Sequence, residues 1–211
     1  MVAKFESKNE HGRTNGHDAI RTPQPIAGQK PTHELVEELH QVPEQGKAEI
    51  IDGEIVHMSP TGGKPGRVGG KIYIQLDVYE RQTGRGYAFP DNVGFIVNLP
   101  HRTSFSPDAA FYVGELAEED FLTGAPLFAV EVRSKNDYGP LAEQAIRDKI
   151  ADYFSAGALV VWDVDALRQK VIRVYRASDP AHPQVYRRGE LADAEPALPG
   201  WRLSVDSIFD S

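Results

Sequence analysis

Two acidic side chains and one lysine stand where the sequence predicts a protein interior. Glu131 lies inside the run 127–132, whose other residues are all apolar, as in a strand buried on both faces. Asp108 follows Pro107 at the start of a further predicted strand. An ionised carboxylate in apolar surroundings is costly unless it is paired or bound to a metal. Glu131 is therefore a candidate for chemistry, and Asp108 is a candidate for the same site.

Lys149 falls on the apolar side of a predicted helix. The helix begins at Pro140, a residue favoured in the first turn, and ends at Gly157, a residue favoured just after the last turn. A lysine that points into an interior needs a carboxylate or a phosphate as its partner, and Glu131 is on the strand that leads into this helix. At 100° per residue the apolar stripe contains Leu141, Ala145, Ile146, Ile150, Tyr153 and Phe154, whereas Gln144, Arg147, Asp148 and Asp152 fall largely outside it.

Taken together, these residues place two acidic groups on neighbouring strands and one cation above them. Hard divalent cations such as Mg²⁺ prefer oxygen ligands, and such an ion can position a water and offset charge on a phosphate. Each residue also has a structural explanation. Asp108 is a typical turn residue, Glu131 shares a strand face with Arg133 and is able to pair with it, and Lys149 is long enough to reach water along its stem.

Local patterns predict the elements that position these residues. Asp52-Gly53 between two β-branched runs predicts a hairpin over 47–58. A short helix is expected from Thr32, and a glycine-rich loop over 59–70 leads into a longer helix. Further strands are predicted over 85–89, 94–99, 109–113, 127–132, 159–164 and 170–176, and the apolar residues of the tail are expected to pack on the sheet. Strands, a helix and strands again indicate an α/β sandwich around a mixed sheet.

Composition restricts the class of protein. The chain has 211 residues, 40% of them hydrophobic, and no apolar run approaches the roughly 18 residues that span a bilayer. The absence of cysteine suits a reducing, cytoplasmic location and excludes thiolate zinc sites. A net charge of -8 argues against coating of nucleic acid through overall charge, but it allows a local basic patch around an acidic metal centre. Residues 1–31 are polar, so we expect a flexible arm followed by one domain over 32–211.

A series of short motifs runs along most of the chain from about Thr32 onward. They are Glu49-Ile-Ile-Asp-Gly-Glu54, Met58-Ser-Pro-Thr-Gly62, Pro107-Asp108, Glu131-Val-Arg-Ser134, the helix that carries Lys149 and Tyr153, Gly157, Trp162-Asp163 and Leu198-Pro-Gly-Trp201. In their order and spacing these motifs resemble the Uma-two-like restriction endonuclease family, which belongs to the PD-(D/E)xK nuclease superfamily.

The resemblance implies a restriction-endonuclease-like sandwich, with a central mixed sheet flanked by helices and an added N-terminal hairpin. It implies hydrolysis of phosphodiester bonds with Asp108 and Glu131 as ligands of Mg²⁺, or of Mn²⁺ in its place. The superfamily motif has a lysine two residues after the glutamate, where this chain has Arg133. Arginine stays protonated and is a poor general base, so we expect Lys149 to be the displaced catalytic lysine.

The hairpin and the glycine-rich stretch supply further candidates. Glu54, or Glu49 in its place, is expected to add a catalytic carboxylate. Arg133 and the basic side chains of the glycine-rich stretch are expected to bind substrate phosphate; in that stretch they are Lys64 and Arg67, with Lys71 nearby.

Nucleic acid, with DNA favoured over RNA, is the expected partner, a homodimer is left open, and no membrane partner is expected. Many family members have a histidine where this chain reads Lys64-Pro-Gly-Arg67. The alternative is therefore a catalytically inactive nuclease fold that binds nucleic acid or a protein. A third hypothesis is a carboxylate-based hydrolase that acts on another substrate. A serine hydrolase is not expected, because Ser134 has no histidine positioned as its base.

Overall fold

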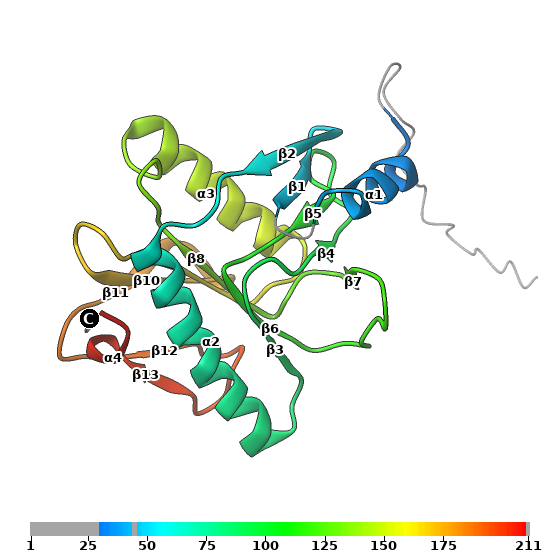
Figure 1. Cartoon of the computed structure of the whole chain (residues 1–211). Coiled ribbons are helices and arrows are strands. Elements are labelled where there is room, and N and C mark those ends of the chain that lie inside the picture. The colour runs from blue at the N-terminus through cyan, green and yellow to red at the C-terminus, as the bar shows by residue number, and fades with distance from the viewer. Residues whose placement is uncertain (1–29, 44–45, 210–211) are drawn as a thin grey trace, which may run out of the picture.

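The structure is a computed structural model and describes residues 30–43 and 46–209 (Figure 1). At its centre lies a six-stranded mixed sheet. Its strands, in spatial order, are β11 (Asp179–Tyr186), β10 (Val171–Arg176), β9 (Val160–Asp165), β8 (Phe128–Val132), β6 (Ala109–Tyr112) and β3 (Tyr87–Phe89). Within this sheet only the neighbours β8 and β9 run parallel, and they are joined by α3 (Pro140–Ser155), because parallel neighbours need a crossover. The mixed α/β architecture predicted from the sequence is confirmed.

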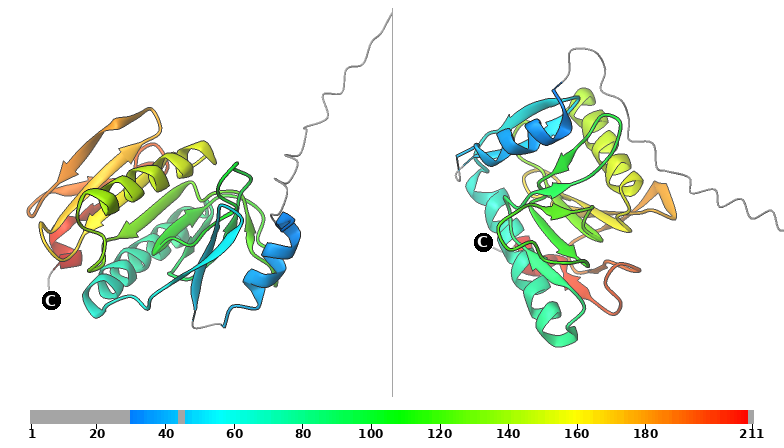
Figure 2. Two further views of the ribbon diagram at one scale, coloured as in Figure 1. Left: turned by 90° about the horizontal axis from the view of Figure 1, so that it is seen from above. Right: turned by 90° about the vertical axis from the view of Figure 1, so that its right-hand side faces the viewer.

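Helices cover both faces of this sheet (Figures 1 and 2). α2 (Gly63–Thr83) packs on one face, where its Ile72 and Leu76 join Phe128 and Val130 in one core. α3 packs on the other face, where Tyr153 contributes to a second core. Side chains alternate across a strand, so Ala129 and Glu131 of β8 point to the α3 side.

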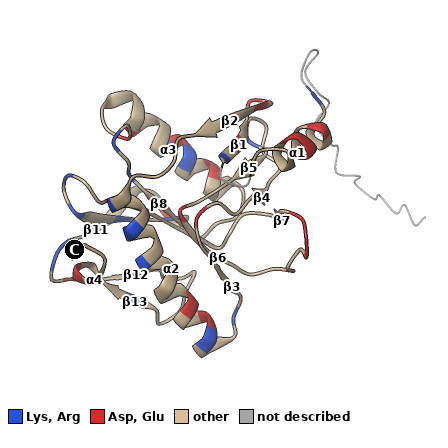
Figure 3. Ribbon diagram, in the orientation of Figure 1, with Lys and Arg blue, Asp and Glu red and all other residues tan. Residues whose placement is uncertain are grey.

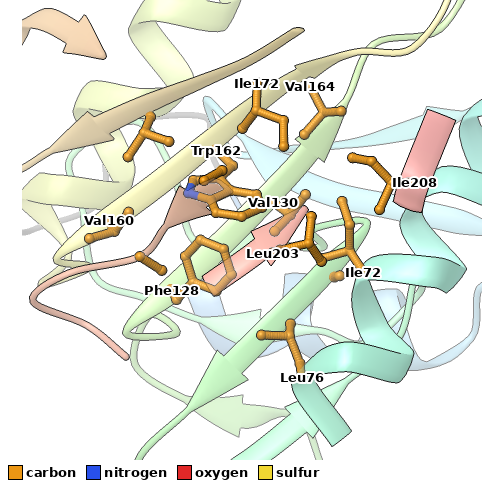
Figure 4. Close-up of a cluster of buried hydrophobic side chains, with 14 of the residues drawn as sticks. Ile72, Leu76, Phe128, Val130, Val160, Trp162, Val164, Ile172, Leu203 and Ile208 are labelled. Carbon is orange, nitrogen blue, oxygen red and sulfur yellow. The ribbon is translucent and has the colours of Figure 1, made fainter. Parts of the chain in front are cut away.

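The C-terminal segment completes the core on the α2 side (Figure 4). It consists of β12 (Leu191–Asp193), β13 (Arg202–Ser204) and α4 (Val205–Phe209). Trp201, Leu203 and Ile208 are buried there against Phe128 and Trp162, and Phe209 is partly buried, as predicted.

A separate two-stranded sheet holds the N-terminal hairpin, β1 (Lys47–Ile51) and β2 (Glu54–Met58). Asp52 and Gly53 both have positive φ, 51° and 76°, as a two-residue hairpin turn of the predicted kind requires. Ala48 and Ile50 pack against α1 (Thr32–His40), so the alternating residues of β1, Lys47 and Glu49, lie on its opposite face. A three-stranded sheet of β5 (Ser104–Phe105), β4 (Phe95–Ile96) and β7 (Leu122–Thr123) lies beside the hairpin and is bonded to it through the amide of Thr103, which donates to the Ile50 carbonyl at 2.9 Å.

The local predictions miss the start of α2 and the strand β11. The stretch 63–70 is helical rather than a loop, because Pro65 suits a first turn and the small Gly69 lets α2 pack closely on the strand ends. β11 was not predicted, because its two prolines are unusual in a strand; it lies at an edge of the sheet, where a missing N–H is tolerated. The predicted arm, 1–31, lies outside the described residues except for its last two. In the part described, no helix is long and apolar enough to cross a membrane.

Candidate active site

Asp108 and Glu131 lie side by side at the sheet edge where β6 begins and β8 ends. Ala109 pairs with Val130, so Asp108 stands one position further along the same ladder, next to Glu131. The Asp108 amide donates to the Val130 carbonyl at 2.9 Å, and the Val132 amide donates to Asp108 Oδ2 at 2.6 Å. Backbone pairing therefore fixes the two carboxylates as neighbours on the α3 side of the sheet.

Lys149 contacts Glu131, as its place in the apolar stripe predicted. Its Nζ lies 2.9 Å from Glu131 Oε1 and 2.9 Å from Glu49 Oε1, which belongs to the hairpin. Tyr153, one helical turn further along α3, donates its hydroxyl hydrogen to Glu131 Oε1 at 2.6 Å. Both contacts of Glu131 fall on Oε1, and its second oxygen accepts no contact from the residues that the structure describes.

The hairpin also brings a second lysine to the site. Lys47 Nζ lies 2.7 Å from Asp108 Oδ1 and 2.8 Å from Asp91 Oδ1, and only 13% of the Lys47 side chain is exposed. Lys47 and Glu49 alternate with the buried Ala48 and Ile50, and this period of two was the available signal for their shared face. Asp91 lies in the turn after β3 and had no signal in the sequence.

Of the two hairpin glutamates, Glu49 and not Glu54 reaches this cluster. Glu54 is exposed beside the turn, opposite Ile51, and does not line the pocket. Glu49 is 1% exposed and binds Arg102 Nη1 at 2.6 Å as well as Lys149. The α1 side of β1 is apolar, so the hairpin turns its odd-numbered side chains inward to the site.

Arg133 is part of an ion-pair network rather than a free cation. Its guanidinium binds Asp163 through Nε and Nη2, both at 2.6 Å, and binds Glu143 on its other side. Arg133 is 5% exposed, and Arg173 lies 3.4 Å from the same Asp163 carboxylate. Arg133 lines the pocket with its guanidinium engaged by two carboxylates, and its role in binding substrate phosphate stays a prediction.

The helix α3 differs from its predicted pattern at both ends. Leu141, assigned to the apolar stripe, is 89% exposed in the first turn of α3. Asp152, assigned outside the stripe, is 6% exposed and pairs with His101 and Arg102, each at 2.7 Å. The pairing of Arg102, which lies in a loop, with Asp152 could not be predicted from local sequence alone.

A pocket of about 700 Å³ opens over the cluster. Lys64 and Lys135 line it without an ion pair or hydrogen bond to any residue in the described part of the chain. Arg67 is exposed near the N-terminal end of α2, where basic residues gather (Figure 3), but it does not line the pocket. Lys71 donates to the Ser207 carbonyl. The charged residues of the lining are Lys47, Lys64, Asp108, Glu131, Arg133, Lys135, Asp137, Lys149 and Asp163.

Burial and mutual charge set the protonation of the cluster. Burial raises the pKa of Glu131, and the charges of Asp108 and Glu49 add to this, against the opposing effect of Lys149 and Lys47. Burial would lower the pKa of Lys149, but Glu131 and Glu49 raise it above its ordinary value. The pKa of Lys47 is raised in the same way by Asp108, Glu131 and Asp91. Both lysines are therefore cations at neutral pH.

The donor set suits Mg²⁺ better than a metal that needs a full protein cage. Among the described residues, no group of three or more His, Cys, Asp or Glu side chains is arranged to hold a metal. Mg²⁺ is usually bound by one or two carboxylates and keeps several waters or substrate oxygens. Asp108 and Glu131 supply two such carboxylates beside an open pocket, and within residues 30–43 and 46–209 the second oxygen of Glu131 has no donor, so the residues fit this ion.

Comparison with known proteins agrees with the fold. Among solved structures, one described as a putative nuclease belonging to DUF820, from Anabaena variabilis, superposes with a TM-score of 0.65 at 18% identity, covering 82% of this chain and 96% of that one. No curated protein matches the sequence. A family model, Uma2, described as "Putative restriction endonuclease", matches residues 36–206, which is most of the chain. The chain therefore belongs to the Uma2 family.

Proposed function

We propose that the chain is a Mg²⁺-dependent endonuclease that hydrolyses phosphodiester bonds of nucleic acid, with DNA as the expected substrate. The observation that carries this proposal is the pair of neighbouring carboxylates, Asp108 and Glu131, beneath a pocket with Lys149 bound to Glu131. The Uma2 membership and the nuclease-like fold support the same reaction class.

Asp108 and Glu131 would hold the metal, and the backbone pairing of their strands keeps the two carboxylates side by side. When bound, Mg²⁺ supplies charge for the phosphate and lowers the pKa of a coordinated water. Tyr153 fixes the rotamer of Glu131 through its hydroxyl, so one carboxylate oxygen is tied to the protein and the other is left to the pocket.

As a fixed positive charge, Lys149 would orient the attacking water or a phosphate oxygen. Its pKa is raised, so it holds its proton at neutral pH and acts as a cation and donor rather than as a base. Lys64 and Lys135 would contact the flanking phosphates, because both line the pocket and neither pairs with a carboxylate in the described part of the chain.

Incubation with supercoiled plasmid, single-stranded DNA and RNA tests the activity directly. We expect cleavage with Mg²⁺ or Mn²⁺, none with EDTA, and none with Asp108→Asn or Glu131→Gln. Asp77→Asn is the matched control, because Asp77 is a carboxylate on α2 whose salt bridge is to the exposed Arg81. Cleavage that persists in EDTA or in both site variants would contradict the proposal.

A non-catalytic binding module is the second candidate, and one observation favours it. The carboxylates of the site are already paired inside the protein, Asp108 with Lys47 and Glu131 with Lys149. A structural ion-pair network would need no metal. Calorimetric titration with Mn²⁺ separates the two, since the enzyme binds the ion at Asp108 and Glu131 and the module does not.

A further inference from the structure

Lys47 occupies a position on Asp108 that a metal ion would also need. Its ammonium lies 2.7 Å from Asp108 Oδ1, and the other oxygen of Asp108 already accepts the Val132 amide. Both oxygens of the carboxylate are therefore engaged within the protein. The side chains of Lys47 and Asp108 are 13% and 12% exposed, so the pair is held close rather than loosely solvated.

A second carboxylate is in place to keep Lys47 when it leaves Asp108. Asp91 Oδ1 lies 2.8 Å from the same ammonium, and the Asp91 side chain is 39% exposed, more than three times the exposure of Asp108. When it is displaced from Asp108, Lys47 therefore keeps one of its two ion pairs. Its buried charge is not left unpaired, which would cost free energy.

We propose that Lys47 is a built-in competitor of the divalent cation: it holds Asp108 until the metal displaces it toward Asp91. This inference rests on the proposed function, because it assumes that Asp108 is a metal ligand. This competition would lower the affinity of the site for the metal. After displacement, the Lys47 ammonium would remain at the pocket wall, where it could bind a phosphate of the substrate.

The competing contact is specific to Lys47 among the lysines of the pocket. Lys149 binds Glu131 and Glu49 and does not contact Asp108. Lys64 lines the same pocket with no carboxylate partner in the described residues. Removal of Lys64 therefore reports the effect of one lost positive charge near the site, without the effect of a lost direct contact.

The test is calorimetric titration of the full chain with Mn²⁺, with wild type, Lys47→Met and Lys64→Met compared. A positive charge in direct contact with a carboxylate repels a second cation on that group far more strongly than a charge farther away in solvent does. We accordingly expect Lys47→Met to bind Mn²⁺ at least about tenfold more tightly than wild type, and Lys64→Met to change the affinity by less than about threefold. Equal or weaker binding by Lys47→Met, or equal tightening by Lys64→Met, would overturn the inference.

Thermal melting supplies a second measurement and guards against a variant that fails to fold. Lys47→Gln keeps a donor for Asp108 without the charge, and we expect it to bind Mn²⁺ with an affinity between those of wild type and Lys47→Met. In both variants Mn²⁺ should raise the melting temperature by more than it does in wild type; an equal or smaller rise counts against the inference.

The two proposals fail in different ways. Wild-type binding of Mn²⁺ with no gain in the Lys47 variants would overturn the inference and leave the proposed function standing. Absence of Mn²⁺ binding in all of the proteins would overturn both.

Discussion

The ammonium of Lys149 bridges Glu131 of the central sheet and Glu49 of the N-terminal hairpin, at 2.9 Å from each carboxylate. The two glutamates are linked by one side chain of α3, the helix that packs on the central sheet. The pKa of Glu49 is lowered by Lys149 and Arg102 in spite of its burial, whereas that of Glu131 is raised. Two glutamates that share one lysine therefore differ in their readiness to give up a proton.

Replacement of Lys149 by methionine should abolish cleavage. Loss of a proton donor or fixed cation at a reacting centre typically costs about 10²–10⁴ in rate, while Glu131 and Asp108 remain to bind metal. We expect Lys149→Met to bind Mn²⁺ but to show no product on plasmid substrate in a time course that wild type completes.

Arg133→Lys is the companion variant. Lysine cannot reproduce the two-sided contact of Arg133 with Asp163 and Glu143. We therefore expect the variant to melt at a lower temperature than wild type and to retain cleavage at low temperature. Loss of cleavage in folded Arg133→Lys, with Lys149→Met still active, would show that Arg133 is the catalytic cation.

Glu131→Gln should lose Mn²⁺ binding and keep its fold. Burial raises the pKa of Glu131, which means that the fold disfavours its charge, and an amide oxygen still accepts the bonds from Tyr153 and Lys149. Urea unfolding should therefore give a free energy equal to or above that of wild type in the absence of metal. A large loss of stability would identify Glu131 as a structural ion-pair partner.

Arg102→Met should be among the most destabilising single changes in the chain. Arg102 is 7% exposed and joins Glu49 at 2.6 Å to Asp152 at 2.7 Å, so its removal takes one cationic partner from each of two buried carboxylates and leaves Glu49 with Lys149 and Asp152 with His101. Loss of one partner of a buried pair costs roughly 3–5 kcal/mol in unfolding free energy. Arg81→Met is the control: it removes an exposed pair with Asp77, and about 1 kcal/mol or less should be lost. Urea unfolding measures both losses of unfolding free energy. Similar losses in the two variants would show that the buried ion pairs of Arg102 stabilise the fold no more than the exposed pair of Arg81 does.

Asp193 should make part of the stability depend on pH in the acid range. Burial would raise the pKa of Asp193, but hydrogen bonds from Tyr186, the Glu195 amide and Arg176 lower it. A carboxyl whose folded pKa is depressed stabilises the fold above its ordinary pKa of about 3.9, and this contribution is lost as the pH falls through the folded value. Asp193→Asn should therefore lower the melting temperature at pH 7, with the difference from wild type shrinking toward roughly pH 2. A difference that does not change with pH would assign the effect to packing alone.

Gly69 sets how closely α2 approaches the site. A Cβ at this position would lie 3.3 Å from the Asp108 carbonyl oxygen and 3.7 Å from Asp108 Cβ, whereas a Cβ on Gly70 would meet nothing within 4 Å. Gly69→Val should destabilise the fold by about 1–3 kcal/mol through overpacking and should weaken Mn²⁺ binding by displacing Asp108. Gly70→Val should do neither, and equal effects from the two valines would show that helix propensity, not contact, is responsible.

The part of the site that lies on β8 and α3 could be predicted from the sequence. Strand parity placed Glu131, helical periodicity placed Lys149, and only 18 residues of chain separate them, so local rules were sufficient. Lys47 and Asp91 could not be predicted, because Lys47 meets Asp108 across 61 residues of sequence and only the docking of the hairpin decides this contact. The same docking decides that Glu49 rather than Glu54 faces the pocket, which the hairpin pattern alone left open.

The position of the hairpin has a consequence for how the protein would lose activity. β1 and β2 form a sheet of their own that is not hydrogen-bonded into the six-stranded sheet, yet they contribute Lys47 and Glu49 to the cluster. Segments outside the central sheet of a structure open at lower free energy than its core strands do. If the hairpin partly detached from its neighbours, Lys47 and Glu49 would move away from Asp108 and Glu131 while the central sheet stayed intact. Inactivation on warming would then be a reversible local event that precedes unfolding, and the hairpin rather than the hydrophobic core would set the upper working temperature.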